Sequence, residues 1–242
     1  KRVSIAPDVP TTAELGMPAI AMTDHGNVHG AYDFWKKAQK HGVNPIIGME
    51  AYVTPGTLRS EKKRVKWGRQ GAGQEAEEGG NDVAGGGAYT HITLLSENTE
   101  GMHNLFRIAS RASLEGFYYK RRADRELLAE HAKGLIATTG CPSGEIQTRL
   151  RLGQYAEARQ AAADFQDIFF FFFYFMELMD HGIDIELRVR EDLLRLAKDL
   201  QIPLIATNDS HYTHPDDAAA HDALICVASG KHIADTNRLK FD

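Results

Sequence analysis

The chain has 242 residues, of which 43% are apolar and 25% are charged, and its formal net charge is −5. This composition is typical of one large or two small globular domains and excludes a disordered chain. No apolar run reaches the roughly 18 residues that a membrane span needs, and no signal peptide opens the sequence, so we expect no membrane association. The negative charge argues against nucleic-acid binding through the overall field of the protein.

Two further features of the composition concern the setting and the partners. Cys141 and Cys226 are too few for a disulfide framework in a chain of this length, so a reducing, cytoplasmic setting is favoured. Basic residues gather in two local clusters, which are interpreted mainly as solvated surface, with phosphate contact as the alternative. The clusters are Lys62, Lys63, Arg64 and Lys66, and Lys120, Arg121 and Arg122.

The first predicted elements are a short strand over 18–23, an amphipathic helix over 30–42 and a second strand over 44–53. Apolar residues recur on one face of the helix, and Gly42 ends it. Residues 56–88 are charged and rich in glycine, a composition that cannot bury a core. We therefore predict a long loop or mobile insertion there.

The second half of the chain continues with alternating strands and helices. The pattern predicts strands over 91–98, 134–140, 168–179 and 202–207, and helices over 99–113, 124–133, 144–153, 155–168 and 185–200. The third of these strands contains five consecutive phenylalanines, 169 to 173, for which the pattern offers no physical reason. Strands that alternate with helices of this length indicate parallel βα units, and we expect an α/β barrel rather than an open sheet.

Side chains that can bind a metal ion follow several of the predicted strands. They are Asp24, His25, Glu50, Cys141, Asp180, His181, Asp209 and His211. The carboxyl ends of barrel strands converge on one face, so these side chains are expected to share one pocket. Because side-chain direction alternates along a strand, Asp209 and His211 would point to the same side. His91 is an exception, since it begins its predicted strand.

The residue types in this set suit a divalent metal. Imidazole, carboxylate and thiolate bind Zn²⁺, Mn²⁺ or Fe, and two or three ions about 3.5–4 Å apart can activate a water and neutralise a phosphoryl group. Each residue alone has a simpler interpretation: Asp209 and His211 as a surface turn, Cys141 as a small residue in a tight turn, Asp180 with His181 as a turn. Their joint position after strands favours the metal site.

Five segments carry a family resemblance. They are "MTDHGNVHGAYDFWKKAQKHGVNPIIGMEAYV", "YTHITLL", "TTGCPSGEIQTRLRLGQ", "ELMDHGI" and "IATNDSHYTH". Together they resemble the PHP (polymerase and histidinol phosphatase) domain of the bacterial DNA polymerase III alpha subunit, most closely its actinobacterial DnaE type, over residues 14–242. The resemblance implies a distorted seven-stranded (β/α) barrel, similar to a TIM barrel, with up to three divalent ions (Zn, Mn or Mg).

The resemblance also implies the ligands and exposes a departure. The implied metal ligands are His25, Glu50, His91, Cys141, Asp209 and His211, and the implied catalytic residues among them are His25, Glu50, Asp209 and His211. The family's first strand bears His-x-His followed by an Asp. This chain begins "KRVSIAPDVPTTAELGMPA" and has neither, and Pro7 and Pro10 suit a helix there poorly. We expect a PHP domain over 1–230 that lacks its first strand, and a connection to a polymerase core over 231–242.

The function implied is that of the N-terminal PHP module of a replicative DNA polymerase, with metal-dependent 3′→5′ exonuclease proofreading in its complete form. The fragment alone is then expected to be inactive. The implied partners are primer–template DNA, the sliding clamp and other replisome subunits, with no membrane. Two alternatives stay open: a non-catalytic domain that braces the polymerase and binds a partner subunit, and a free-standing phosphoesterase acting on a small phosphate monoester.

Overall fold

The computed structural model describes residues 8–68, 83–236 and 238. The strands are β1 (Ala19–Met22), β2 (Asn44–Val53), β3 (Thr90–Ser96), β4 (Phe117–Tyr118), β5 (Lys120–Ala123), β6 (Leu135–Thr138), β7 (Tyr174–Leu178) and β8 (Leu204–Ala206). The helices are α1 (Asp8–Glu14), α2 (Ala31–His41), α3 (Thr99–Glu115), α4 (Arg125–Glu130), α5 (Glu145–Arg151), α6 (Tyr155–Ile168), α7 (Asp184–Leu200) and α8 (Ala218–Ser229), with short 3-10 turns η2 (Ala84–Gly87) and η3 (Pro215–Asp217).

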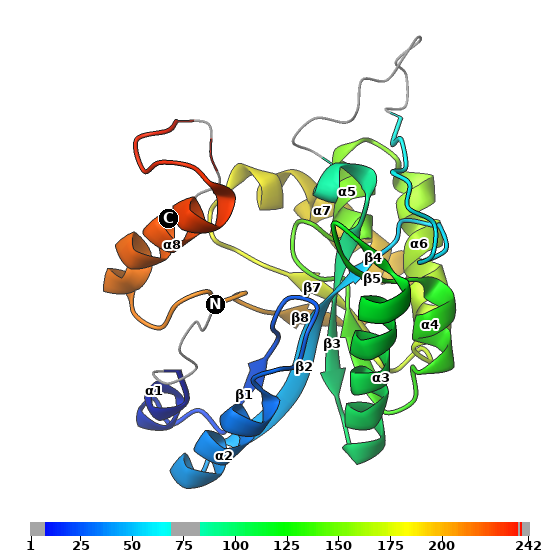
Figure 1. The fold of residues 1–242 in the computed structure, drawn as a ribbon. Helices are drawn as coiled ribbons and strands as arrows, with labels where there is room; N and C mark the ends of the chain where they lie inside the picture. The colour runs from blue at the N-terminus through cyan, green and yellow to red at the C-terminus, as the bar shows by residue number, and fades with distance from the viewer. Residues whose placement is uncertain (1–7, 69–82, 237, 239–242) are drawn as a thin grey trace.

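The strands form a curved sheet with helices on its outer side (Figure 1). The strand order is β4-β5-β2-β3-β6-β7-β8, and β1 pairs with β2. This half-barrel confirms the predicted α/β barrel class. β1 and β5 lie along the same edge of β2, β8 is the strand at the other side of the sheet, and in the described ranges β1 and β8 do not pair with each other. No helix in the described part of the chain has the length and apolarity to cross a membrane.

One of the predicted strands, β3, runs against the predicted parallel order. β1, β6, β7 and β8 have parallel neighbours, but β3 is antiparallel to both β2 and β6. Val53 at the end of β2 faces Thr90 at the start of β3, so the connection 54–89 leaves and re-enters the sheet at the same end. A parallel pair would need a crossover to the opposite end, which this connection does not make. The prediction of parallel units throughout is therefore wrong at β3.

Burial separates the middle of the sheet from its ends. Residues 47–53 of β2 are buried, as are Leu94 of β3 and Met176 of β7. Helices α2, α3 and α7 pack apolar faces on this sheet, for example Phe34 and Leu105, and each large apolar side chain so buried contributes about 1.5–3 kcal/mol. In contrast β8 is largely exposed, with Leu204 at 49%. The central strands are therefore the rigid part of the barrel.

Some local predictions hold and others fail. Asn98 caps α3 through a bond from the Gly101 amide (3.0 Å), as its position before the helix predicts. Helix α1 forms despite Pro10, because Pro10 lies in the first turn, where its missing amide has no intrahelical partner. The hairpin β4–β5 and the helix α8 were not predicted.

The phenylalanine run is not strand throughout. β7 begins only at Tyr174, and the preceding residues form a turn in which Phe170 and Phe171 have φ of 54° and 42°. Residues other than Gly and Asn rarely adopt this left-handed backbone conformation. Phe169 is buried, whereas 170–172 are exposed. The predicted strand is thus shorter because the chain must turn between α6 and β7.

The predicted insertion 56–88 is only partly described, since 69–82 lie outside the described residues. Its two ends are packed: Trp67 and Val83 are buried together with Leu152, and the guanidinium of Arg149 lies 4.7 Å from the Trp67 ring. The predicted long loop therefore packs on either side of 69–82 through Trp67 and Val83, whereas Leu58 stays exposed.

Candidate metal centre

His25 and Glu50 are brought together by the parallel pairing of β1 with β2. The chain turns after β1, and the Gly26 amide donates to the Glu50 carbonyl oxygen at 2.9 Å. Gly26 has φ of 62°, and a Cβ there would lie 2.9 Å from the Tyr52 ring, so the turn requires glycine. His25 Nδ1 then lies 3.1 Å from Glu50 Oε2.

His91 joins them because β3 is antiparallel to β2. Its position faces Tyr52, two residues from Glu50, and its Nδ1 hydrogen-bonds Glu50 Oε1. The start of an antiparallel strand lies beside the end of its neighbour, which explains why His91 begins a strand and still reaches the site. The candidate ligand atoms of His25, Glu50 and His91 lie within 4.8 Å of one another.

Cys141 approaches from the turn after β6. The His91 amide donates to the Ser143 carbonyl oxygen (3.0 Å), which fastens this turn to β3. Cys141 Sγ lies 3.3 Å from Glu50 Oε1 and 3.5 Å from His91 Nδ1. Burial, together with the charge of Glu50, raises the pKa of the Cys141 thiol. We call His25, Glu50, His91 and Cys141 the sheet wall, since each stands at an end of a strand of the sheet.

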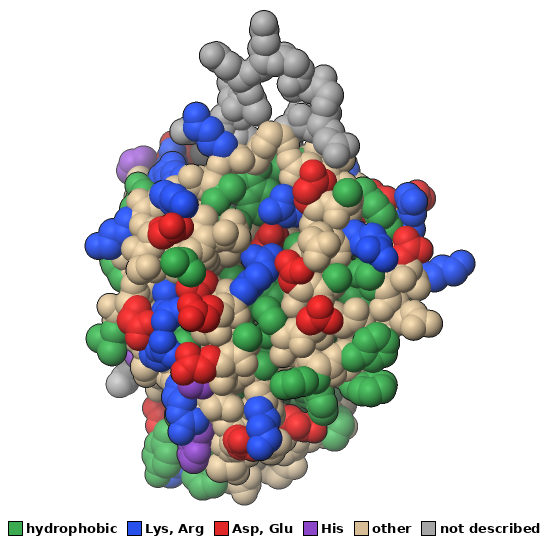
Figure 2. Space-filling view, turned by 90° about the vertical axis from the view of Figure 1, so that its right-hand side faces the viewer, with side chains coloured by type: hydrophobic (Ala, Val, Ile, Leu, Met, Phe, Trp, Pro, Cys, Tyr) green, Lys and Arg blue, Asp and Glu red, His purple; other side chains and the backbone are tan. Residues whose placement is uncertain are grey.

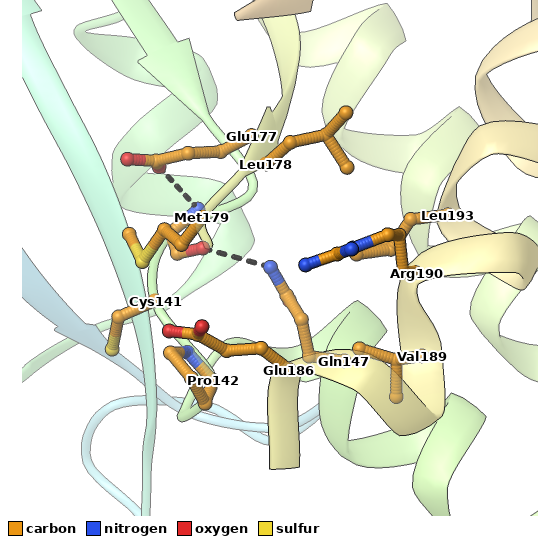
Figure 3. A pocket seen from close by; sticks show the side chains of 11 residues that line it. Cys141, Pro142, Gln147, Glu177, Leu178, Met179, Glu186, Val189, Arg190 and Leu193 are labelled. Carbon is orange, nitrogen blue, oxygen red and sulfur yellow. Dashed lines mark hydrogen bonds between the residues drawn. The ribbon is translucent and has the colours of Figure 1, made fainter. Parts of the chain in front are cut away.

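A cavity behind the Cys141 turn is lined by a hydrogen-bonded network (Figure 3). Gln147 Nε2 donates to the Gly140 carbonyl oxygen at 2.8 Å, and the Gly140 amide donates to Glu177 Oε2 at 3.1 Å. Glu177 also accepts from the hydroxyls of Thr138 and Thr207, which ties the ends of β6, β7 and β8 together. The sequence did not single out Glu177; its signal is one carboxylate inside an apolar strand.

Asp209 and His211 form a second group, which we call the loop wall. β8 ends at Ala206, so these residues lie in the following loop, and the alternation of a strand does not orient them as predicted. Asp209 has φ of 43°, a left-handed backbone. The His211 ring centroid lies 6.5 Å from that of His25, which places the loop wall beside the sheet wall.

A hydrogen bond within the loop wall sets the tautomer of His211. His211 Nδ1 lies 2.7 Å from the Asp209 carbonyl oxygen, an acceptor only, so Nδ1 carries the proton and donates. The lone pair is then on Nε2, which is the arrangement of a metal-binding histidine. Burial and the charge of Glu50 raise the pKa of Asp209. On α8, the ring of His221 lies 5.5 Å from that of His211, a neighbour that the sequence did not reveal.

The remaining candidates are used elsewhere. The carboxylate of Asp180 is 71% exposed and pairs with Arg190 at 2.8 Å. His181 Nδ1 lies 2.7 Å from Glu186 Oε1, and Nε2 lies 2.8 Å from the Asn208 carbonyl oxygen. Both nitrogens face acceptors, and the bond to Glu186 raises the pKa of His181. Asp24 contributes its carbonyl oxygen, which accepts from the Glu50 amide at 3.1 Å.

The electrostatics of the sheet wall suit a cation. Burial raises the pKa of Glu50, but the hydrogen bond from His91 and the two nearby imidazoles outweigh it and lower the pKa to about 2. Burial lowers the pKa of His25. Glu50 as an ionised carboxylate and His25 as a neutral imidazole each have a lone pair that can bind a cation. With His91 and the Cys141 sulfur, the donor set matches the mixed nitrogen, oxygen and sulfur sites that bind borderline divalent metals.

Comparison with known proteins finds related sequences over most of the chain. The family model described as "PHP domain" matches residues 3–181. A DNA polymerase III subunit alpha of Saccharopolyspora erythraea is 58% identical over 94% of this chain, and one of Mycobacterium tuberculosis is 52% identical over 98%. One from Treponema pallidum is 40% identical over 96%. The matched regions are 19%, 20% and 18% of those proteins, so the chain spans about a fifth of their length.

Proposed function

Because this chain belongs to the PHP domain family, we propose that it is the N-terminal PHP module of a DNA polymerase III alpha subunit and removes mismatched 3′ nucleotides in a metal-dependent reaction. The identity to such subunits over nearly the whole chain supports the first part. The donor set around Glu50 supports the second part. The domain would extend over 1–230, with 231–242 leading to the polymerase core, which would supply polymerisation and contacts to primer–template DNA, sliding clamp and replisome.

The proposed ligands come from both walls. They are His25, Glu50, His91, Cys141, Asp209 and His211. When bound, divalent ions would activate a water for attack on the terminal phosphodiester and offset the negative charge that develops on the phosphoryl group. We infer His25, Glu50, Asp209 and His211 as the residues closest to the chemistry.

The protein's own groups prepare this arrangement. The Glu50 carboxylate holds the imidazoles of His25 and His91 on either side of it. The Asp209 carbonyl oxygen fixes the tautomer of His211. The network around Glu177 holds the Cys141 turn in place and closes the rear of the site. Holding these groups before substrate arrives reduces the reorganisation that the reaction requires.

The observation that carries the proposal is the convergence of His91 with His25 and Glu50. His91 is at the wrong end of its strand for a parallel barrel, yet the reversed direction of β3 brings it to the same carboxylate. The three residues come from segments that are far apart in sequence. A surface turn or a solvated carboxylate would not need such an arrangement.

The test uses the full-length protein. Metal content by elemental analysis and release of single nucleotides from a 3′-mismatched primer are measured beside polymerisation. Asp209→Asn should lower release at least roughly 100-fold and spare polymerisation, because the ligand charge is lost while the left-handed backbone is kept. Asp216→Asn, an exposed residue of η3 just after this loop, is the matched control and should change neither.

A structural role is the second candidate, since among the described residues Asp209 and His211 are not part of the close donor group around Glu50, and the half-barrel is open between β1 and β8. In that case the domain would brace the polymerase and bind a partner subunit. Equal loss of release and polymerisation in Asp209→Asn would favour it. Absence of metal and of release, with polymerisation intact, would contradict the exonuclease proposal.

A further inference from the structure

The two basic clusters of the sequence meet in space at the β4–β5 hairpin. The guanidinium carbon of Arg64 lies 4.8 Å from the centre of the Tyr119 ring, at the tip of that hairpin. Arg64, Tyr119, Lys120 and Arg121 are all exposed, and we call them the hairpin surface. Lys120 and Arg121 make no ion pair with a carboxylate among the described residues, so their charges face solvent.

Arg122 differs from its neighbours, because it is the buried anchor of this hairpin. Its guanidinium donates to the carbonyl oxygens of Gly116 (3.1 Å), Ala88 (3.2 Å) and Glu61 (3.0 Å). These bonds join the hairpin to both ends of the long connection between β2 and β3. The interpretation of the second cluster as solvated surface is therefore wrong for Arg122, whereas Lys120 and Arg121 are exposed, as both solvated surface and phosphate contact require.

The hairpin surface is continuous with the candidate metal centre. Lys120 Nζ lies 5.4 Å from the centre of the Tyr52 ring, and that ring lies 6.0 Å from His25 and 5.1 Å from His91. β2 pairs with β5 at Tyr52 and Arg122, which fixes this spacing through the sheet. A strand of nucleic acid whose end lies at His25 and His91 would therefore have Lys120 close beside it.

We propose that the hairpin surface binds the single-stranded 3′ end of DNA and leads it into the metal centre. Lys120, Arg121 and Arg64 contact phosphates, and a base stacks on the ring of Tyr119. Basic side chains interleaved with an exposed aromatic ring are the pattern of single-strand binding surfaces. This inference rests on the proposed exonuclease function and names the residues that deliver its substrate.

The face formed by α3, α4 and α6 lacks this pattern. Figure 2 shows this face, where acidic and basic side chains are interspersed. Several of these basic residues are paired, as Arg111 is with Glu115 (2.9 Å). Such a surface attracts no polyanion, and the overall charge of −5 does not either. Lys120 and Arg121 differ from this face because they form no ion pair among the described residues, and a DNA strand would meet their charges directly.

The first test is photocrosslinking with the full-length protein in EDTA, which prevents cleavage. The probe is oligodeoxythymidylate with 5-iododeoxyuridine as its 3′-terminal nucleotide. We expect a crosslink in the peptide that contains Tyr119. Lys120→Gln with Arg121→Gln should lower its yield roughly fivefold or more and reduce the slope of log affinity against log salt by about 1.4, since each lost single-strand phosphate contact contributes about 0.7. Lys36→Gln with Lys40→Gln, an exposed pair on α2 of equal charge change, is the control.

The second test separates stacking from charge. Tyr119 has φ of 61°, so Tyr119→Asn removes the ring while keeping a residue that tolerates this backbone. We expect KM for 3′-nucleotide release to rise about fivefold or more, with kcat and the salt slope nearly unchanged. A crosslink confined to peptides outside the hairpin, or an equal loss in the α2 control pair, would overturn the inference. A hairpin crosslink without any nucleotide release would keep the binding surface and overturn the exonuclease function alone.

Discussion

The two walls of the candidate metal centre differ in how the fold holds them. The sheet wall stands on β1, β2, β3 and β6, and its residues contact one another through Glu50. The loop wall follows β8, an exposed end strand, and depends on a left-handed residue, Asp209. The sheet therefore holds the sheet wall in place before any metal or substrate binds. The loop wall depends on the conformation of a short loop, so the two should respond differently to substitution.

Removing the Glu50 charge should have the largest effect. Glu50→Gln keeps the side-chain shape but loses the carboxylate that both His25 and His91 contact. Loss of groups behind a ligand already costs 10–100-fold in metal affinity, so we expect a loss of roughly 100-fold or more here. Equilibrium dialysis against Mn²⁺ or Zn²⁺ measures it. Glu157→Gln, an exposed residue on α6, should bind metal as the parent does.

Removing a loop-wall ligand should have a smaller effect on metal affinity. In His211→Gln the sheet wall remains intact, so we expect partial metal content where Glu50→Gln retains almost none. The weakening should stay within about 10–100-fold, because the pre-formed donors still bind. The same dialysis on the two variants side by side gives the comparison. Equal losses would show that neither wall binds without the other and would break the distinction.

The same division decides what could be predicted from sequence. β2 and α6 have the predicted bounds because their periodicity and end signals are local properties of the chain. His25 and Glu50 were found because they lie near the carboxyl ends of strands, His25 after β1 and Glu50 within the last residues of β2. His91 was found only through the family resemblance, since the direction of β3 depends on where a long connection returns. This is tertiary information that no local pattern contains.

The contacts that hold the loop wall could not be predicted from the sequence either. His181 was interpreted as a turn residue or a ligand, but its ring bridges Glu186 on α7 and the backbone of Asn208. A contact between segments so far apart leaves no periodic signal. The turn at Phe170 and Phe171 was missed for the opposite reason, since the residues there oppose the conformation that the fold imposes. In both places packing overrides local preference.

The loop wall should depend on pH through His181. Its pKa is raised above the ordinary value of 6.5 by the hydrogen bond to Glu186. A group with a raised folded-state pKa stabilises the fold fully below the unfolded value, and this stabilisation is lost as the pH rises through the folded value. His181→Gln should therefore speed amide hydrogen exchange in 205–214 relative to the parent at pH 5.5, and less so at pH 8.5. A ratio that does not change with pH would assign His181 a packing role only.

The smallest effect concerns backbone strain, and it compares strain at a proposed ligand with strain in a turn away from the site. Phe171 and Asp209 have φ of 42° and 43°, one in a turn away from the site and one in the loop wall. The left-handed conformation costs a residue with a side chain about 1–2 kcal/mol, and a change to glycine removes this cost. Glycine also raises the entropy of the unfolded chain, which offsets part of the gain, so each change to glycine should stabilise the protein by up to about 1 kcal/mol. Thermal unfolding midpoints measure the gain. Phe172→Gly is the control, since Phe172 has no positive φ and should gain nothing.

The pair is informative because the expected stabilities agree while the activities differ. Phe171→Gly should keep nucleotide release and lose an exposed aromatic side chain, whereas Asp209→Gly should lose release at the same gain in stability. Strained residues are retained at sites where the surrounding structure imposes them for a purpose. If Asp209→Gly gains no stability while Phe171→Gly does, the bonds from His181 and His211 to this loop already compensate the strain at Asp209. The loop wall would then be as pre-formed as the sheet wall, and its dependence on substitution would come from lost ligands alone.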